Sequence, residues 1–424
     1  MAPERFRGMQ LQEEFDAYDG CDALLSAKQK FLTERSRIIE IVAAKDIIFA
    51  LSRSGLCAAF DRVTNKRVAF LNSSPDEVIR SMLYNKYNDS LITVSLYSSD
   101  SYRSLNCRAT PLECVRRNEL DAGFPIFESE SLKWPGFVEF DSVNGKALIY
   151  AAQEGIYKVF DLANYSFLYS IQAANVHDIK ISQGFMLVIY DRMPSYVSLK
   201  ILSIADGKPI KSFKHSLQPN KRVVFMEHFN EKLLVKQEGE NIQILDVRSS
   251  ELIEISATKF VNPQALVVLY GRNLFLISRN RTATVWNFQG ELVTSFEDHL
   301  LWHDNVWSAN DIYITKDEGR IISYCKSEAV EDDGTVTPIG SINMSDIMTG
   351  KCIAKIAANN PTISIAPCRN GCNKRSSVSC TPPEALKDVT AVFYDEDRNE
   401  IYTGNKHGLL HLWSNSSGFI FRKL

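Results

Sequence analysis

Residues 389–424 contain the unit on which the fold assignment depends. They read Val389-Thr-Ala-Val-Phe-Tyr394, a polar turn, Ile401-Tyr-Thr-Gly404, a second turn, Leu409-Leu-His-Leu-Trp413, a third turn, and Phe419-Ile-Phe-Arg-Lys-Leu424. Each run is short, rich in β-branched and aromatic residues, and bounded by Gly, Asn, Asp or Ser, which is the pattern of strands joined by tight turns. The unit therefore predicts four consecutive antiparallel strands.

The junction between the third and fourth strands of this unit recurs along the chain. An apolar run ends in a large residue, usually followed by a short polar one, and a turn leads to a second apolar run. Asp, Asn and Ser side chains in such turns bond to nearby backbone amides, and Gly adopts positive φ. Seven copies are visible: Phe60-Asp61, Phe160-Asp161, Leu202-Ser203, Leu245-Asp246, Trp286-Asn287, Ser345-Asp346 and Trp413-Ser414.

The spacing of these copies predicts a β-propeller. Their polar residues at 161, 203, 246 and 287 are separated by steps of 42, 43 and 41 residues, and a period of roughly 40 to 50 residues is typical of propeller blades. The step of 100 residues between 61 and 161 leaves room for a poorly matching unit at 77–134. We therefore expect an all-β fold, a single propeller of seven to eight four-stranded blades. Unit counting gives eight, beginning near residues 38, 78, 136, 175, 222, 264, 305 and 388.

These junctions resemble the WD-repeat family of transducin-like propellers, in which the third strand of a blade ends in a Trp-Asp dipeptide. The resemblance covers about residues 38–424, but no copy has the complete Trp-Asp pair and no Gly-His dipeptide opens a unit. It implies a propeller that binds other proteins. It also implies that the family's buried network of His, Ser or Thr, Asp and Trp is largely missing here.

Three segments fall outside the repeat. Residues 1–37 are expected to form an N-terminal extension, with one or two short helices within 9–37 because apolar residues recur there at mixed spacings of three and four. Insertions are expected at 326–340, an acidic loop, and at 358–387. The second insertion contains Cys368, Cys372 and Cys380, with Cys352 upstream. Thiolate clusters can bind zinc, but without a neighbouring histidine we expect ordinary thiols and no metal or cofactor.

Composition narrows the classes of partner. A net charge of −3 provides no general attraction to nucleic acid or anionic membranes. The apolar runs are too short to cross a bilayer, and the N-terminus lacks the order of a secretory signal. Nine scattered cysteines fit reduced thiols better than a disulfide framework. We expect a cytoplasmic or nuclear chain whose partners are proteins.

The sequence has no local signature of catalysis. It contains no phosphate-binding loop, no Gly-x-Ser-x-Gly elbow and no His-Glu-x-x-His motif. We therefore expect a scaffold that is not an enzyme, although propeller enzymes can gather polar residues from several blades at the central channel. Trp302 and Trp307, in a connection between units, are candidate partner contacts, with core packing as the alternative.

One segment suggests a specific alternative function. WD-repeat substrate receptors of cullin-RING ubiquitin ligases bind their adaptor through a box ending in Trp-Asp-x-Arg. Residues 244–248, Ile-Leu-Asp-Val-Arg, look similar, with Asp246 and Arg248 in place and Leu245 where the family has Trp. The resemblance implies an adaptor contact through Asp246 and Arg248. The alternative is that Asp246 makes its blade turn and Arg248 lies in water.

Overall fold

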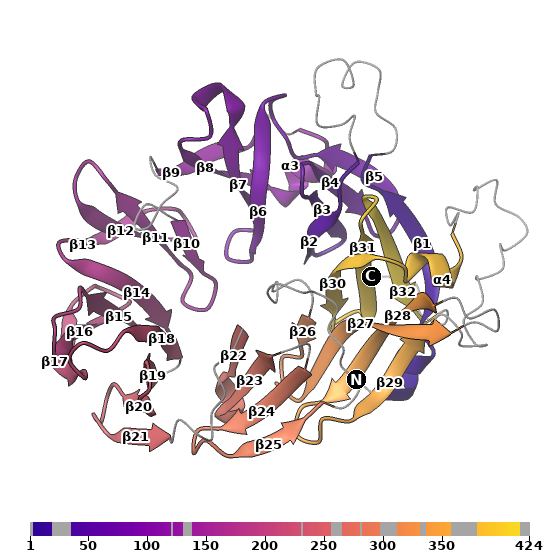
Figure 1. Ribbon diagram of the computed structural model, residues 1–424. Helices are drawn as coiled ribbons and strands as arrows, with labels where there is room; N and C mark the ends of the chain where they lie inside the picture. The colour runs from indigo at the N-terminus through magenta and orange to yellow at the C-terminus, as the bar shows by residue number, and fades with distance from the viewer. Residues whose placement is uncertain are drawn as a thin grey trace, which may run out of the picture.

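The computed structural model confirms an all-β propeller of eight four-stranded sheets arranged in a ring (Figure 1). It describes residues 3–18, 35–119, 122–129, 138–229, 232–255, 265–279, 282–296, 312–330, 336–357 and 380–415. Within each sheet neighbouring strands are antiparallel, and the first strand lies toward the centre of the ring.

The first four sheets follow the chain in order. Blade 1 contains β2 (Ile38–Ala44), β3 (Ile47–Ser52), β4 (Cys57–Asp61) and β5 (Lys66–Phe70). Blade 2 contains β6 (Glu77–Asn85), β7 (Ser90–Tyr97), β8 (Leu105–Pro111) and β9 (Phe124–Ser129). Blade 3 contains β10 (Val138–Asp141), β11 (Lys146–Ala151), β12 (Ile156–Asp161) and β13 (Phe167–Gln172). Blade 4 contains β14 (Val176–Ser182), β15 (Phe185–Tyr190), β16 (Tyr196–Ser203) and β17 (Pro209–Ser216).

The second half of the ring repeats this order until its last strand. Blade 5 contains β18 (Val223–Phe229), β19 (Lys232–Gln237), β20 (Ile242–Asp246) and β21 (Leu252–Ile255). Blade 6 contains β22 (Ala265–Leu269), β23 (Leu274–Arg279), β24 (Thr282–Asn287) and β25 (Leu292–Ser295). Blade 7 contains β26 (Ile312–Ile314), β27 (Arg320–Val330), β28 (Val336–Asp346) and β29 (Cys352–Ala357). Blade 8 contains β30 (Val389–Asp395), β31 (Glu400–Asn405), β32 (Leu409–Ser414) and, as its outermost strand, β1 (Gln10–Asp16).

The eighth blade corrects two expectations. The sequence pattern predicted the fourth strand of this blade at 419–424, which lie outside the described residues. It also predicted one or two short helices within 9–37. Instead β1 pairs antiparallel with β32, with Leu11 opposite Trp413 and Glu14 opposite His411. The helical prediction is wrong for residues 10–16, and residues 19–34 lie outside the described part. A short helix does precede the strand, α1 (Pro3–Arg7), whose Phe6 is buried. The N-terminus therefore closes the ring.

Apolar side chains fill the space between every pair of neighbouring sheets. The buried residues that the structure describes form eight clusters, one at each blade interface, including the interface between blades 8 and 1. Inner strands are covered on both faces, as β3 shows with all six residues buried. Because each sheet is covered only by its neighbours, closure of the ring completes the core.

The turns between third and fourth strands have the chemistry that the repeat suggested. The Asp61 carboxylate accepts hydrogen bonds from the amides of Val63 and Thr64, at 2.9 and 2.6 Å. Asn287 and Asp346 accept similar bonds from amides three or four residues later. Gly207 adopts φ +69° at this position, where a Cβ would lie 2.5 Å from the Tyr169 ring.

The insertions differ in character from the expected loops. The acidic segment at 326–340 extends the β27–β28 hairpin, because Lys326 pairs with Gly340 and Val330 with Val336. The loop prediction is therefore wrong for 326–330 and 336–340, while 331–335 lie outside the described residues. Of the insertion at 358–387, residues 380–387 are described and include α4 (Pro382–Ala385). Blade 2 also holds α3 (Leu112–Arg116) and the 3-10 turn η2 (Ser98–Asp100), and blade 6 holds η4 (Tyr270–Arg272).

An ion-pair network joins the first blade to the last. The side chain of Arg62, 2% exposed, reaches from the β4–β5 turn to the Asp395 and Glu400 carboxylates of blade 8, at 2.7 and 2.5 Å. Its Nε also donates to the Tyr402 hydroxyl at 3.0 Å, and its Nη1 to the Lys45 carbonyl at 3.0 Å. The arginine thus fastens the two ends of the ring.

Candidate functional site

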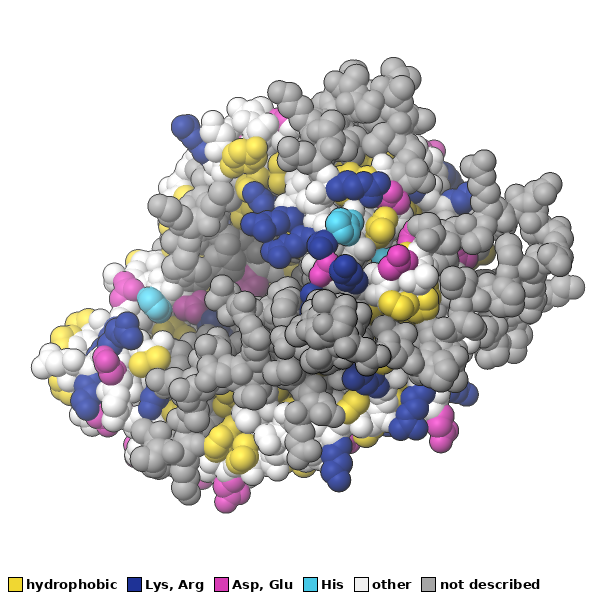
Figure 2. Space-filling model, turned by 45° about the vertical axis from the view of Figure 1, so that its right-hand side comes forward, with side chains coloured by type: hydrophobic (Ala, Val, Ile, Leu, Met, Phe, Trp, Pro, Cys, Tyr) yellow, Lys and Arg dark blue, Asp and Glu magenta, His cyan; other side chains and the backbone are white. Residues whose placement is uncertain are grey.

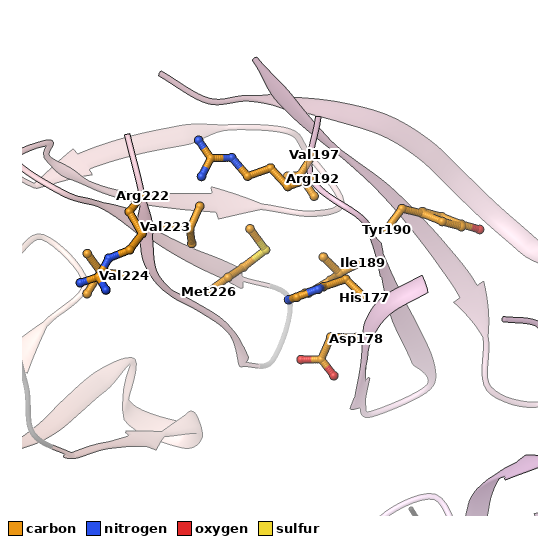
Figure 3. Close-up of a pocket in the computed structure, with 10 residues that line it drawn as sticks. All are labelled: His177, Asp178, Ile189, Tyr190, Arg192, Val197, Arg222, Val223, Val224 and Met226. Carbon is orange, nitrogen blue, oxygen red and sulfur yellow. The ribbon is translucent and has the colours of Figure 1, made fainter. Parts of the chain in front are cut away.

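A pocket of about 360 Å³ opens between blades 4 and 5. Consecutive antiparallel strands place the start of β14, the end of β15 and the start of β18 at the same face, which we call the connector face because it carries the connections between successive sheets. All three strands contribute to the lining (Figure 3), which consists of His177, Asp178, Ile189, Tyr190, Arg192, Val197, Arg222, Val223, Val224 and Met226.

The floor of the pocket is apolar and part of it is accessible. Ile189 and Val197 are buried against the interface between blades 4 and 5, and Met226 packs beside them. Val224, which lines the pocket, is 38% exposed, and Met193, which follows the lining residue Arg192 in the chain, is 46% exposed. Exposed apolar side chains that gather at the opening of a pocket are typical of binding surfaces.

Two arginines give the pocket a basic rim. Arg192 and Arg222 are exposed, and within the described residues neither forms an ion pair. The Arg192 guanidinium donates to the Lys221 carbonyl at 2.6 Å, which holds it beside the opening. Met226 and His177 lie between Arg192 and Asp178 (Figure 3). The carboxylate of Asp178 is already paired with Lys180 at 2.9 Å, so the two arginines are the charged lining residues that form no ion pair with the described part of the chain.

A carboxyl group with an unusual pKa lies next to this site. Burial raises the pKa of Glu139, on β10, to about 7, against the influence of the Lys180 ammonium, and the neighbouring carboxylate of Asp178 raises it further. A shifted carboxyl group near a cleft is a candidate functional residue. His177, however, has its Nδ1 3.8 Å from Asp191, and both side chains are largely exposed. That separation is too long for an oriented acid–base pair.

The structure shows how the two residues of the suggested adaptor box are used. The Asp246 carboxylate accepts the amides of Arg248 and Ser249 at 2.9 and 2.8 Å and pairs with Lys232. Burial raises the pKa of the Asp246 carboxyl group, but the hydrogen bonds from Lys232 and from these amides outweigh it and lower the pKa to about 2. Arg248 is exposed with its guanidinium 5.7 Å from the centre of the Phe185 ring. Asp246 therefore makes its blade turn.

Other residues that the sequence singled out have varied surroundings. Four of them lie outside the described residues: Trp302, Trp307, Cys368 and Cys372.

The large residues at the ends of the third strands differ in burial. Trp413 is fully buried and its indole N–H donates to Thr403 at 3.0 Å, whereas Trp286 is half-buried. Phe60 is buried, and Phe160 is half-buried beside Asp161, which pairs with Lys146.

One possible ligand set for a metal involves a cysteine from the second insertion. Cys380 Sγ lies 3.4 Å from His411 Nε2, and that nitrogen lies 3.2 Å from a carboxylate oxygen of Glu14. Within the described residues these three form the one group of ligand-type atoms close enough to share an ion. No histidine is near Cys380 in the sequence, and His411 reaches it in the fold from β32.

A family model described as "Domain of unknown function (DUF7899)" matches residues 1–413. The chain belongs to this family. No curated protein matches the sequence. Among solved structures, the chain is similar to the crystal structure of the computationally designed Ika8 protein, with 15% identity, 90% of this chain and 97% of that chain covered, and a TM-score of 0.50. It is also similar to the crystal structure of BamB from Moraxella catarrhalis, with 11% identity, 96% and 99% covered, and a TM-score of 0.45.

These likenesses concern the fold of the DUF7899 domain and assign no function to it. The residues matched by the family model include β1, so the strand that closes the ring is part of the family domain. The α-helices that the structure describes, α1, α3 and α4, contain four or five residues each and cannot span a bilayer. Figure 2 shows Lys and Arg side chains grouped near the middle of one face, so the formal charge of −3 is unevenly distributed.

Sequence reasoning missed the pocket of this DUF7899 domain almost entirely. None of the lining residues was among the candidate site residues of the sequence. Arg192 and Arg222 stand in connections with no recurring motif, and 30 positions separate them, counting from 192 to 222. The available signal was that each arginine adjoins an apolar strand at a predicted connection on the same face.

Proposed function

We propose that this chain is a non-catalytic scaffold that binds partner proteins at the connector face, through the pocket between blades 4 and 5. The observation that carries the proposal is an accessible apolar pocket with two arginines at its rim that form no ion pair with any described residue. Apolar anchors surrounded by polar groups are the usual composition of protein-binding sites, and arginine is enriched in them.

The chemistry of the pocket suggests the kind of segment that would bind. Its volume suits one or two apolar side chains in contact with Val223, Val224 and Met226. Arg192 and Arg222 would then face carboxylates of the same segment, because planar guanidinium groups recognise carboxylates in two-point hydrogen bonds. We infer a partner segment in which an apolar residue stands next to acidic residues.

The lining residues support a role without catalysis. None of them is a Ser, Thr, Cys or Lys, and the one carboxylate among them, that of Asp178, is paired with Lys180. Among the described residues, the acid partner of the site's histidine is Asp191, whose carboxylate at 3.8 Å is beyond hydrogen-bonding distance. Binding by shape and charge requires neither a nucleophile nor an oriented acid–base pair.

Quantitative affinity purification with matched variants tests the proposal. Arg192→Glu with Arg222→Glu should remove a defined set of partners that the wild-type chain retains. The control is Lys208→Glu with Lys351→Glu, which changes the net charge equally at exposed turns of the opposite face. A synthetic peptide from a recovered partner, with adjacent apolar and acidic residues, should bind the wild type and the control variant. It should not bind the variant with Arg192→Glu and Arg222→Glu. Equal recovery by both double variants would exclude the pocket as the binding site.

The runner-up function is a substrate receptor of a cullin-RING ubiquitin ligase docked through Asp246 and Arg248. In its favour, Arg248 is exposed at a blade turn, on the surface of the propeller where an adaptor would bind. Against it, the carboxylate of Asp246 is occupied within its own turn. Reconstitution with the purified ligase adaptor separates the two: a complex lost in Arg248→Ala, but kept in the exposed-site control Arg53→Ala, would favour the receptor.

We further propose kinship with WD-repeat propellers and a cytoplasmic or nuclear location. The hydrogen bond from the Trp413 indole to Thr403 and the Asp-capped turns support the kinship. A profile of DUF7899 sequences should then match WD repeats in the register that aligns Asp61, Asp161 and Asp346. The described cysteines are all free thiols, which suits a reducing compartment. Fluorescent tagging at the endogenous locus would test the location.

A further inference from the structure

We propose that Glu14, Cys380 and His411 form a zinc-binding site on blade 8. Their ligand atoms, a carboxylate oxygen, Sγ and Nε2, all lie within 4.8 Å of one another. They come from three parts of the chain: β1, the residue preceding the α4 capping box, and β32. The site is distinct from the pocket between blades 4 and 5 and does not depend on the proposed scaffold function.

Two of the three separations between these atoms match the edges of a zinc tetrahedron, and the third, between Cys380 Sγ and the Glu14 oxygen, is within 4.8 Å. With Zn–N of about 2.0 Å, Zn–O of about 2.1 Å and Zn–S of about 2.3 Å, tetrahedral angles place N and O about 3.4 Å apart and S and N about 3.5 Å apart. The structure has 3.2 Å between His411 Nε2 and the Glu14 oxygen, and 3.4 Å between that nitrogen and Cys380 Sγ. An ion can therefore enter with small side-chain movements.

Burial and ligand chemistry both favour zinc among the common metals. The His411 side chain is 1% exposed and that of Glu14 is 9% exposed, so the ligands are held by the surrounding sheet. A thiolate, an imidazole and a carboxylate form a mixed soft and borderline set, which suits zinc and is poor for calcium or magnesium. Three protein ligands leave the fourth position for a water molecule or another donor.

An ion at this position would strengthen the closure of the ring. Glu14 and His411 are opposite each other in the pairing of β1 with β32, and Cys380 lies where the second insertion returns to blade 8. A ligand that binds only the folded arrangement stabilises it. Zinc would thus connect the N-terminal strand and the end of the insertion to the last sheet.

The competing explanation is a metal-free hydrogen-bond network. In it, His411 and Cys380 would both donate to the Glu14 carboxylate. Such a network needs no ion, and the thiol of Cys380 would react with alkylating reagents in the same way with or without zinc. The two explanations therefore differ in metal content and in thiol reactivity.

Metal analysis of the full chain tests the site. After loading with zinc chloride and exhaustive dialysis, the wild type should retain one zinc ion per chain, measured by inductively coupled plasma mass spectrometry. Cys380→Ser and His411→Gln should lose most of it. The matched controls Cys114→Ser, at a half-buried thiol on α3, and His215→Gln, at a buried histidine of blade 4, should retain it. Zinc-free wild type, or site variants that retain as much as the controls, would overturn the proposal.

A second measurement uses the unmodified chain, so it does not depend on whether a variant folds. Alkylation by iodoacetamide is followed at individual cysteines by peptide mapping, with and without zinc. Zinc should slow labelling of Cys380 at least several-fold and leave labelling of Cys114 unchanged. Replacement by Co²⁺ should produce a thiolate charge-transfer band that is absent in Cys380→Ser. Equal labelling of Cys380 in both conditions would exclude the site.

Discussion

Replacing Arg62 by methionine should strongly destabilise the propeller at the contact between its first and last blades. Methionine keeps much of the aliphatic stem but removes the guanidinium, which pairs with Asp395 and Glu400 and donates to Tyr402. Breaking a buried ion pair from one side costs about 3 to 5 kcal/mol, because the remaining charges stay partly desolvated. Asp395 and Glu400 are 14% and 22% exposed, so we expect the lower end, about 3 kcal/mol.

Urea denaturation at pH 7, followed by circular dichroism, measures this loss as a lower transition midpoint. Arg53→Met, at an exposed site, is the control and should change stability by less than about 0.5 kcal/mol. Adding Asp395→Asn and Glu400→Gln to Arg62→Met should restore part of the loss, because both stranded charges are removed. A loss below about 1 kcal/mol, or no recovery in the triple variant, would refute the view that this network fastens the ring.

The remaining predictions concern burial, pH and close packing. Trp413→Ala should cost about 3 to 5 kcal/mol by thermal or urea denaturation because its ring is fully buried, and the half-buried Trp286→Ala clearly less; equal losses would contradict the assigned burial. Burial raises the pKa of Glu139 from 4.5 to about 7, so between pH 4.5 and 7 the folded state binds a proton that the unfolded state has lost. The stability of the fold therefore decreases as the pH rises from 4.5 to 7. Glu139→Gln should therefore be more stable than wild type at pH 8, by at most about 3 kcal/mol, with little difference at pH 4.5; a gain that is the same at both pH values would disprove the assignment. Gly404→Ala should cost about 1 to 3 kcal/mol, because the new Cβ would lie 2.5 Å from Cβ of Ile38 across the contact of blades 8 and 1; an unchanged melting temperature would show that the contact is looser.

The sequence by itself determined the repeating sheets, because their signals are local. Asp61, Asn287 and Asp346 bond to amides within four residues of themselves, so the turn chemistry is contained in the segment that displays it. Predicted blade starts near 38, 175 and 222 correspond to strands that begin at Ile38, Val176 and Val223. Even the poorly matching second unit forms a complete sheet, since alternation and turns remain when individual motif residues change.

Only the tertiary structure decided which distant segments meet. Residues 10–16 have an apolar pattern that fits helix or strand, and their partner strand begins at Leu409, so the pairing that closes the ring has no local signal. Arg192 and Arg222 reach one pocket because antiparallel strands return two connections to the same face. The sequence drew attention to Cys380, but His411 approaches it only when blade 8 folds, and Glu14 joins them only when β1 closes the ring by pairing with β32.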